Sequence, residues 1–289
     1  MKRYCAPLFC LFILMGALSL EGVRITETEV DGHPVFLIET DRATYHYRIR
    51  SGGFASILDR DGNDWVSHKT RLEDPYPEGA ASRFRGLPNM VFGSEDNGAG
   101  HPAFERCLSI LVDERTIRSF SISGTWQWSW QFSEADAVLT VEEADPDHPY
   151  WFLYEGPIAG TFRPDRQYWG TSRKGPVFEF PDYLKGETEF DQWDWAYFGD
   201  RAYERVFFVQ QLTPDRIPDC FGYLGNTREG LASPDGMVVF GFGRYERAAP
   251  QMTRVPQKFR IGFIEQAITD EAAHQQLAEN MAAAIESGN

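Results

Sequence analysis

The chain has 289 residues, with 43 acidic and 28 basic side chains and a formal net charge of −15. This charge argues against nucleic acid as a partner, since that affinity comes largely from Lys and Arg on phosphates. It argues equally against docking on an anionic membrane. A locally basic pocket for an acidic substrate is still compatible with it, because net charge says little about one pocket.

The first residues, 1–22, have the pattern of a secretory signal peptide. Lys2 and Arg3 precede an apolar run from Leu8 to Leu18, and small residues follow near the end of that run. The run is shorter than the roughly 20 apolar residues of a membrane span, although an uncleaved anchor is the alternative. We therefore expect a secreted or periplasmic protein in which residues 23–289 form one domain.

Short strand patterns follow one another through the first half of the chain. β-Branched and aromatic residues recur in partial alternation, and turn signals separate the segments. The expected strands are 23–30, 35–39, 44–50, 54–59, 108–113, 116–123, 125–132 and 137–144. Trp126, Trp128 and Trp130 have the spacing that puts three side chains on one face of a strand. That face either packs in a core, which we favour, or forms a platform on which sugar rings stack.

The segment 83–107, RFRGLPNMVFGSEDNGAGHPAFERC, has neither the alternation of a strand nor the spacing of a helix. It is much longer than ordinary connections of roughly 4–6 residues. It also gathers arginines, asparagines, glycines and one histidine. Long irregular segments in ordered domains often carry binding or catalytic residues, although a plain surface loop is the alternative. We expect this loop to form one wall of a binding site.

The second half begins with a strand at Tyr150–Glu155, and residues 161–200 are again irregular and rich in Arg, Trp, Tyr and Asp. The last expected strands are 205–211, 237–244 and 258–265. Only 270–287 is convincingly helical, with Thr269 as the expected N-cap. The pattern predicts an all-β protein, a large antiparallel β-sandwich with long loops and a C-terminal helix.

Two groups of residues resemble a known family. The first is 45–50 followed by Gly52-Gly53-Phe54 and by the turn 59–65, DRDGNDW. The second is 238–244, VVFGFGR, with 259–263, FRIGF, at the end of the chain. Together they resemble the galactose-mutarotase-like supersandwich of carbohydrate-active proteins, which include epimerases, hydrolases and polysaccharide lyases. The resemblance implies this fold and a carbohydrate substrate.

β-Elimination from a uronic acid needs a base next to the carboxylate, a group that holds the carboxylate, and an acid for the leaving oxygen. We expect His101 or Tyr154 to act as base or acid. Arg85 and Asn89 would then neutralise the acidic sugar. Each has a structural alternative, such as a histidine that only bonds backbone or a tyrosine with a satisfied hydroxyl. The further substrate-binding candidates are Arg83, Glu155, Arg163, Arg166, Tyr168, Trp169, Arg173 and Trp193.

A polysaccharide lyase is thus the leading hypothesis, and two other functions stay open. A glycoside hydrolase needs two carboxylates, one of which would be Glu155. Its partner would come from Asp191, Asp194, Asp200 and Glu204. The third hypothesis is a non-catalytic carbohydrate-binding module.

Cys107 and Cys220 remain after removal of the signal, and they either form a disulfide or stay as two buried thiols. No zinc motif is present, and we expect no cofactor. Structural calcium could bind at Glu95-Asp96-Asn97 or Asp145-Pro146-Asp147, although solvated turns are the more ordinary explanation.

Overall fold

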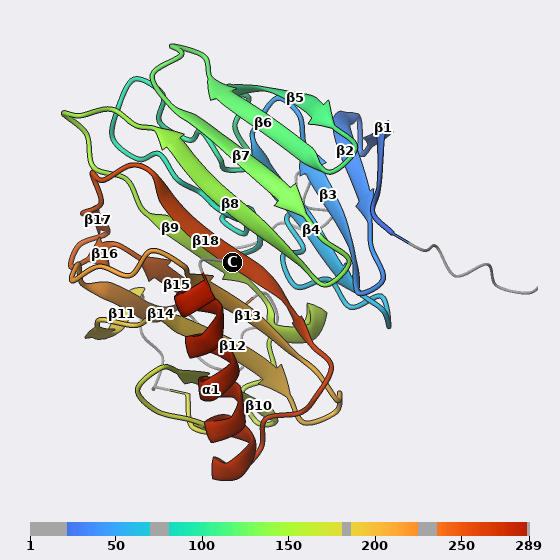
Figure 1. The fold of residues 1–289 in the computed structure, drawn as a ribbon, viewed down its shortest axis with the longest axis vertical. Helices are drawn as coiled ribbons and strands as arrows, with labels where there is room; N and C mark the ends of the chain where they lie inside the picture. Colours follow the sequence, from blue (N-terminus) through green and yellow to red (C-terminus); the bar gives the residue numbers. More distant parts are fainter. Residues whose placement is uncertain (1–21, 70–80, 181–185, 225–235, 288–289) are drawn as a thin grey trace, which may run out of the picture.

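The structure is a computed structural model, and it describes residues 22–69, 81–180, 186–224 and 236–287. Its strands pack in two layers (Figure 1). The strands of the first layer are β5 (Cys107–Asp113), β6 (Thr116–Ser121), β7 (Gln127–Phe132), β8 (Asp136–Glu143), β10 (Gln167–Thr171), β12 (Trp195–Asp200), β13 (Val206–Gln211) and β18 (Gln257–Ile264). They form one eight-stranded antiparallel sheet in the order β10-β12-β13-β18-β8-β7-β6-β5.

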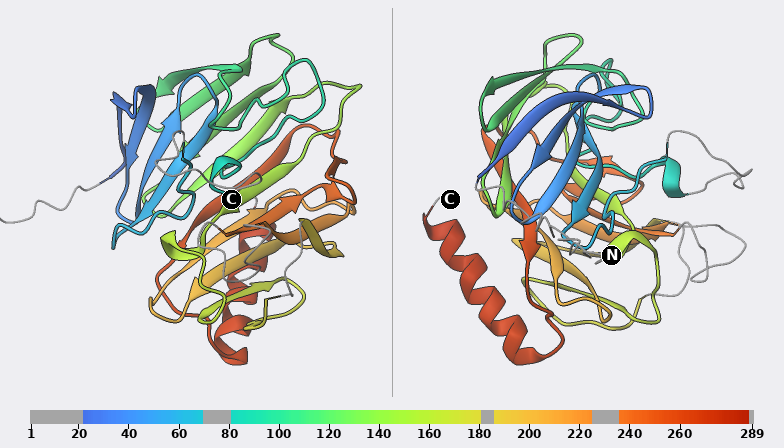
Figure 2. Two further views of the ribbon diagram at one scale, coloured as in Figure 1. Left: turned by 180° about the vertical axis from the view of Figure 1, so that it is seen from behind. Right: turned by 90° about the vertical axis from the view of Figure 1, so that its right-hand side faces the viewer.

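The second layer contains two four-stranded antiparallel sheets, which lie next to each other when seen from behind (Figure 2). One has the order β1 (Arg24–Val30), β2 (His33–Glu39), β3 (Ala43–Arg48), β4 (Gly53–Asp59). The other has the order β11 (Gly186–Asp191), β14 (Asp219–Leu224), β15 (Met237–Phe242), β9 (Phe152–Gly156). Smaller elements are η1 (Ala81–Arg83), η2 (Ile158–Gly160), β16 (Arg244–Tyr245) and β17 (Ala249–Pro250).

Residues 86–90, which we call the crossing segment, join these two sheets. On one side, the backbone N–H of Phe54 in β4 donates to the Leu87 carbonyl at 2.7 Å. On the other side, Gly86 and Glu155 of β9 exchange backbone hydrogen bonds of 2.9 and 3.0 Å. The beginning of the expected binding loop therefore pairs like a short strand, because its backbone groups would otherwise be buried without partners.

Aromatic side chains fill the space between the layers. Trp126, Trp128 and Trp130 are at most 1% exposed, so the core interpretation of this face is confirmed and the platform interpretation is wrong. Phe54 from the second layer meets Trp130 edge-on at a centroid distance of 4.9 Å. The indole of Trp128 donates to the hydroxyl of Tyr47 at 3.1 Å. The predicted all-β sandwich is confirmed.

The helix α1 (Glu271–Ser287) covers the outer face of the eight-stranded sheet (Figure 2). Its Leu277 and Met281 pack in one cluster with Tyr197 and Phe208. The helix begins one residue later than expected, and Asp270 rather than Thr269 caps it, because the Asp270 carboxylate accepts the backbone N–H of Ala273 at 2.8 Å. No described helix is long and apolar enough to cross a membrane.

The expectation that 161–200 is irregular is wrong, since its described part contains β10, β11 and β12. β14 was not expected either. All six residues of β12 are buried, as are all five of β10. Strands that are covered on both faces lose the alternation by which strands are recognised.

Cys107 and Cys220 are buried free thiols in different layers, so the disulfide alternative is wrong. The signal expected at 1–22 lies outside the described residues, apart from Gly22.

Candidate functional site

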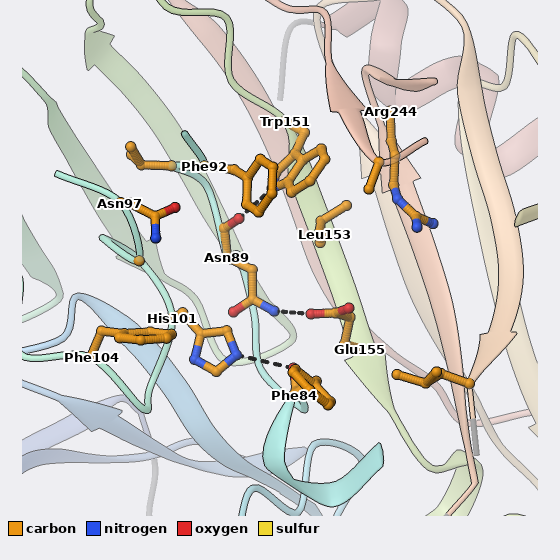
Figure 3. Close-up of a pocket in the computed structure, with 14 residues that line it drawn as sticks. Phe84, Asn89, Phe92, Asn97, His101, Phe104, Trp151, Leu153, Glu155 and Arg244 are labelled. Carbon is orange, nitrogen blue, oxygen red and sulfur yellow. Dashed lines mark hydrogen bonds between the residues drawn. The ribbon is translucent and has the colours of Figure 1, made fainter. Parts of the chain in front are cut away.

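A pocket of about 300 Å³ lies over the crossing segment and β9 (Figure 3). Eight of its fourteen described lining residues lie between Phe84 and Phe104. The long loop therefore supplies most of one wall. The opposite wall comes from β9 and from Arg244, which directly follows the turn after β15.

The alternation of β9 decides which of its side chains reach the pocket. Leu153 and Glu155 line it, as does Trp151, which directly precedes the strand. Tyr154 points the other way, into the core, where its ring packs 5.2 Å from that of Phe198. Neighbouring residues of a strand lie on opposite faces, so Tyr154 and Glu155 cannot both belong to the site.

Glu155 is a titratable group whose pKa the pocket brings near neutrality. Burial raises its pKa from 4.5 to about 7, while the positive charge of Arg244 and a hydrogen bond from Asn89 act in the opposite direction. The Asn89 side-chain amide donates that bond to the Glu155 carboxylate. A carboxylate with a pKa near neutrality can both take up and release a proton in a reaction. Among the described residues, Glu155 is the only carboxylate that lines the pocket.

The backbone places Asn89 for this contact. Its φ of 47° lies in the left-handed region, which asparagine adopts more readily than most residues. Gly86 lies against the same amide: a Cβ atom there would sit 2.5 Å from Asn89 Oδ1 and 2.5 Å from a side-chain carbon of Pro102. The chain therefore needs a glycine at position 86 to bring Asn89 to Glu155.

His101 lines the pocket as expected, but both of its ring nitrogens are occupied. Nδ1 accepts the backbone N–H of Ala103 at 3.0 Å, so the proton of the neutral ring is on Nε2, which donates to the Phe84 carbonyl at 3.1 Å. Burial lowers the pKa of His101 to about 4, and the positive charge of Arg48 acts in the same direction. His101 therefore stays neutral at pH 7 and holds two points of the loop together.

Sequence reasoning missed two residues of this region. His68 lies behind His101, with ring centroids 5.9 Å apart, and burial lowers its pKa to about 3. Arg244 ends the VVFGFGR stretch that the resemblance had already identified, and its guanidinium donates to Cys220 Sγ at 3.4 Å. A cation at the end of an otherwise apolar closing strand is the signal that could have singled out Arg244.

Two of the four expected catalytic residues lie away from the pocket. The guanidinium of Arg85 donates to the carbonyls of Ser67 at 3.2 Å and Gly236 at 3.4 Å. The hydroxyl of Tyr154 donates to the Trp65 carbonyl at 2.8 Å, and burial raises its pKa well above the ordinary value. Both side chains stabilise the framework behind the site.

Of the eight expected substrate-binding residues, the pocket includes Glu155 and leaves out the other seven. Four of those are held within the strands or by nearby partners. Trp169 stacks on Phe221 at 4.5 Å, and Arg166 binds Asp200 at 2.8 Å. Tyr168 and Trp193 are also buried in the core. The remaining three, Arg83, Arg163 and Arg173, are exposed outside the pocket.

One carboxylate of each calcium candidate forms hydrogen bonds within the chain. Asp96 accepts the hydroxyl of Ser121 at 2.7 Å, and Asp145 accepts the backbone N–H of Asp147 at 2.9 Å. In the described ranges, no group of three or more His, Cys, Asp or Glu residues is arranged to hold a metal ion.

Neither a protein-family model nor a curated protein sequence matches this chain. Solved structures do match it. The protein HI1317 is similar with a TM-score of 0.51 and 11% identity, over 83% of this chain and 96% of its own. YeaD from Salmonella typhimurium, described as a candidate mutarotase, has a TM-score of 0.50 and 10% identity. The match covers 84% of this chain and 94% of YeaD. A Paenibacillus xanthan lyase has a TM-score of 0.46 and 8% sequence identity. The match covers 89% of this chain but 26% of the length of the lyase. The likeness to HI1317 and YeaD shows that the chain has the galactose-mutarotase-like supersandwich fold.

Proposed function

We propose that the pocket binds a sugar and that Glu155 transfers a proton during a reaction on it. The single observation that supports this most strongly is the partly buried carboxylate with a pKa of about 7 in a pocket lined by aromatic side chains. Aromatic rings bind the apolar C–H faces of sugars, and a proton-transfer group works best with a pKa near the working pH. The likeness to YeaD, described as a candidate mutarotase, supports a sugar as the ligand.

β-Elimination from a uronate unit is the first candidate reaction. Arg244 would bind the substrate carboxylate, because a guanidinium neutralises the charge that builds up there. Glu155 would take the proton from the carbon next to this carboxylate, and the electron pair left behind would form a carbon–carbon double bond as the glycosidic oxygen leaves. The same Glu155 would then give its proton to that oxygen, which requires both groups to lie on one face of the sugar.

Interconversion of sugar anomers is the second candidate. In this reaction a base takes the proton of the anomeric hydroxyl as the bond between the anomeric carbon and the ring oxygen breaks, and the ring oxygen receives that proton. The open chain then closes on either face by the reverse steps. It needs one tuned proton-transfer group and no second carboxylate next to the pocket, which matches the described lining. Among the described residues the lining holds one carboxylate, Glu155, whereas a hydrolase of the two-carboxylate kind needs a pair.

Export belongs to the same proposal. The pattern of residues 1–22 is that of a secretory signal, and extracellular or periplasmic glycans would then be the substrates. The negative net charge is compatible with such a location, and it disfavours nucleic acid and anionic membranes as partners.

Product analysis tests the proposal. Uronate-containing glycans should give the ultraviolet absorbance of an unsaturated uronate if elimination occurs. Exchange between anomers of free sugars, followed by NMR, would identify the second reaction instead. Glu155→Gln should lower the rate roughly 100- to 10,000-fold in either case. Glu204→Gln, an exposed matched control, should not.

Three outcomes count against the proposal. New reducing ends without the unsaturated product would point to hydrolysis. Binding of sugars without any turnover would indicate a non-catalytic module. Full activity of the Glu155→Gln protein would remove Glu155 as the proton-transfer group.

A further inference from the structure

The rim of the pocket exposes three phenylalanines. Phe84, Phe92 and Phe104 are 45%, 51% and 45% exposed, and all three come from the long loop. Asn89 and Arg244, in contrast, are 5% and 7% exposed. The pocket thus has buried polar groups inside and an apolar rim outside, and exposed apolar surface next to a pocket marks a place where a ligand binds.

Contacts within the protein hold these rings in place. Phe92 stacks on Trp151, with centroids 5.2 Å apart and planes inclined by 28° (Figure 3). Phe104 meets the ring of His101 edge-on at 5.2 Å. His101 also holds the backbone of Phe84 through Nε2. A ligand that binds between such rings loses less affinity to ordering them, because they are already positioned.

A sugar without substituents cannot make favourable contacts with all three phenylalanines of this rim. A sugar ring has two apolar faces, so it can stack on two of the three phenylalanines at most. Its hydroxyl edge at the third ring would lose water without gaining a hydrogen bond, which costs free energy. An aromatic or aliphatic group would instead bury apolar area against the ring, which is favourable.

We infer that the ligand is a sugar carrying an aryl or acyl substituent, with the sugar at Glu155, Asn89 and Arg244 and the substituent between the rim phenylalanines. This rests on the proposed function, since it takes the polar interior as the place of the sugar. It adds a class of ligand, apolar-substituted glycosides, and it assigns the specificity for that substituent to Phe84, Phe92 and Phe104.

Calorimetric titration with methyl and phenyl glucuronides and galacturonides tests this inference. Neither compound carries a leaving group at its fourth carbon, so elimination does not consume them. The phenyl compound of the preferred sugar should bind at least about tenfold more tightly than its methyl partner. Phe92→Ser and Phe104→Ser should each reduce this ratio roughly 3- to 10-fold. Phe178→Ser, which removes a 39% exposed phenylalanine outside the pocket, should leave it unchanged.

The failures of the two proposals differ. Equal affinity for methyl and phenyl compounds overturns the inference and leaves the proposed function in place. Phenol that binds as tightly as the phenyl glycosides shows that the sugar contributes nothing, which overturns the proposed function and this inference with it. A preference for phenyl that survives both rim substitutions overturns the assignment of specificity to the rim.

Discussion

Residues 83–107 and 161–200 look alike in the sequence, since each interrupts the strand pattern and each is rich in Arg and aromatic residues. In the structure, the first supplies the crossing segment and most of one pocket wall. The second contains β10 and β12, which lie between the other layer and α1. An irregular pattern therefore has two causes: a loop around a site, or a strand buried on both faces.

The glycines distinguish the two regions. Gly93, Gly98 and Gly100 have φ values of 81–93°, as in turns. Gly170 and Gly199 lie in strands and face tyrosines: a Cβ on Gly170 would come 2.4 Å from the ring of Tyr197, and one on Gly199 would come 2.3 Å from the ring of Tyr168. The two triplets Tyr-Xaa-Gly, 168–170 and 197–199, pair in antiparallel register so that each tyrosine covers the glycine of the other.

The largest expected effect concerns the proton on Glu155. A pKa of about 7 in the folded protein, above the ordinary 4.5, means that folding favours the protonated form. This stabilisation is complete below about pH 4.5 and is lost as the pH rises through 7, and it corresponds to about 3 kcal/mol. Glu155→Gln should remove this loss, as measured by denaturant unfolding at several pH values. The Glu204→Gln control should still lose this stability as the pH rises. If the stability of the Glu155→Gln protein depended on pH in the same way as that of the wild type, the burial of Glu155 would be contradicted.

Gly170→Ala should lower the stability of the fold and leave the binding of sugar in the pocket unchanged. The new Cβ would overlap Tyr197, and overpacking of a core costs about 1–3 kcal/mol. We expect the free energy of unfolding to fall by about 2 kcal/mol. Sugar affinity per folded molecule should not change. A loss of affinity at unchanged stability would place the second region in the site after all.

Gly86→Ala should have the opposite profile, with the effect mainly on the site. A Cβ there would push the Asn89 amide away from Glu155. We expect sugar affinity to fall roughly tenfold, the equivalent of about 1.4 kcal/mol, because the polar interior is displaced. Titration calorimetry, with the thermal unfolding midpoint as the control for folding, measures this. Unchanged affinity would show that the Asn89–Glu155 contact is dispensable.

Tyr154→Phe should have the smallest effect. It removes the hydroxyl that bonds the Trp65 carbonyl and keeps the ring, so stability should fall by about 1 kcal/mol. Turnover should stay at the wild-type level, because the side chain lies on the core face of β9. A strong loss of turnover would return Tyr154 to the catalytic role expected from the sequence.

Strand alternation predicts much of this fold. Every strand expected between 23 and 144 is present, with ends shifted by no more than two residues. Prediction failed where both faces are covered, as in β10 and β12. Of the site residues it named, Asn89, His101 and Glu155 line one pocket, because an irregular polar loop and the end of a strand converge there. It could not assign Arg244, since only the register of β15 against β9 brings that strand to the pocket.

The crossing segment gives the site an unusual dependence on the whole sandwich. The backbone hydrogen bonds that support Asn89 and Glu155 are the same ones that hold the two four-stranded sheets side by side. Hydrogen exchange at the amides of Phe54, Gly86 and Glu155 therefore reports both on separation of the sheets and on the integrity of the pocket. A ligand bound at Glu155 should therefore slow the exchange of all three amides. The effect should reach Phe54 in β4, a strand that the ligand itself does not contact.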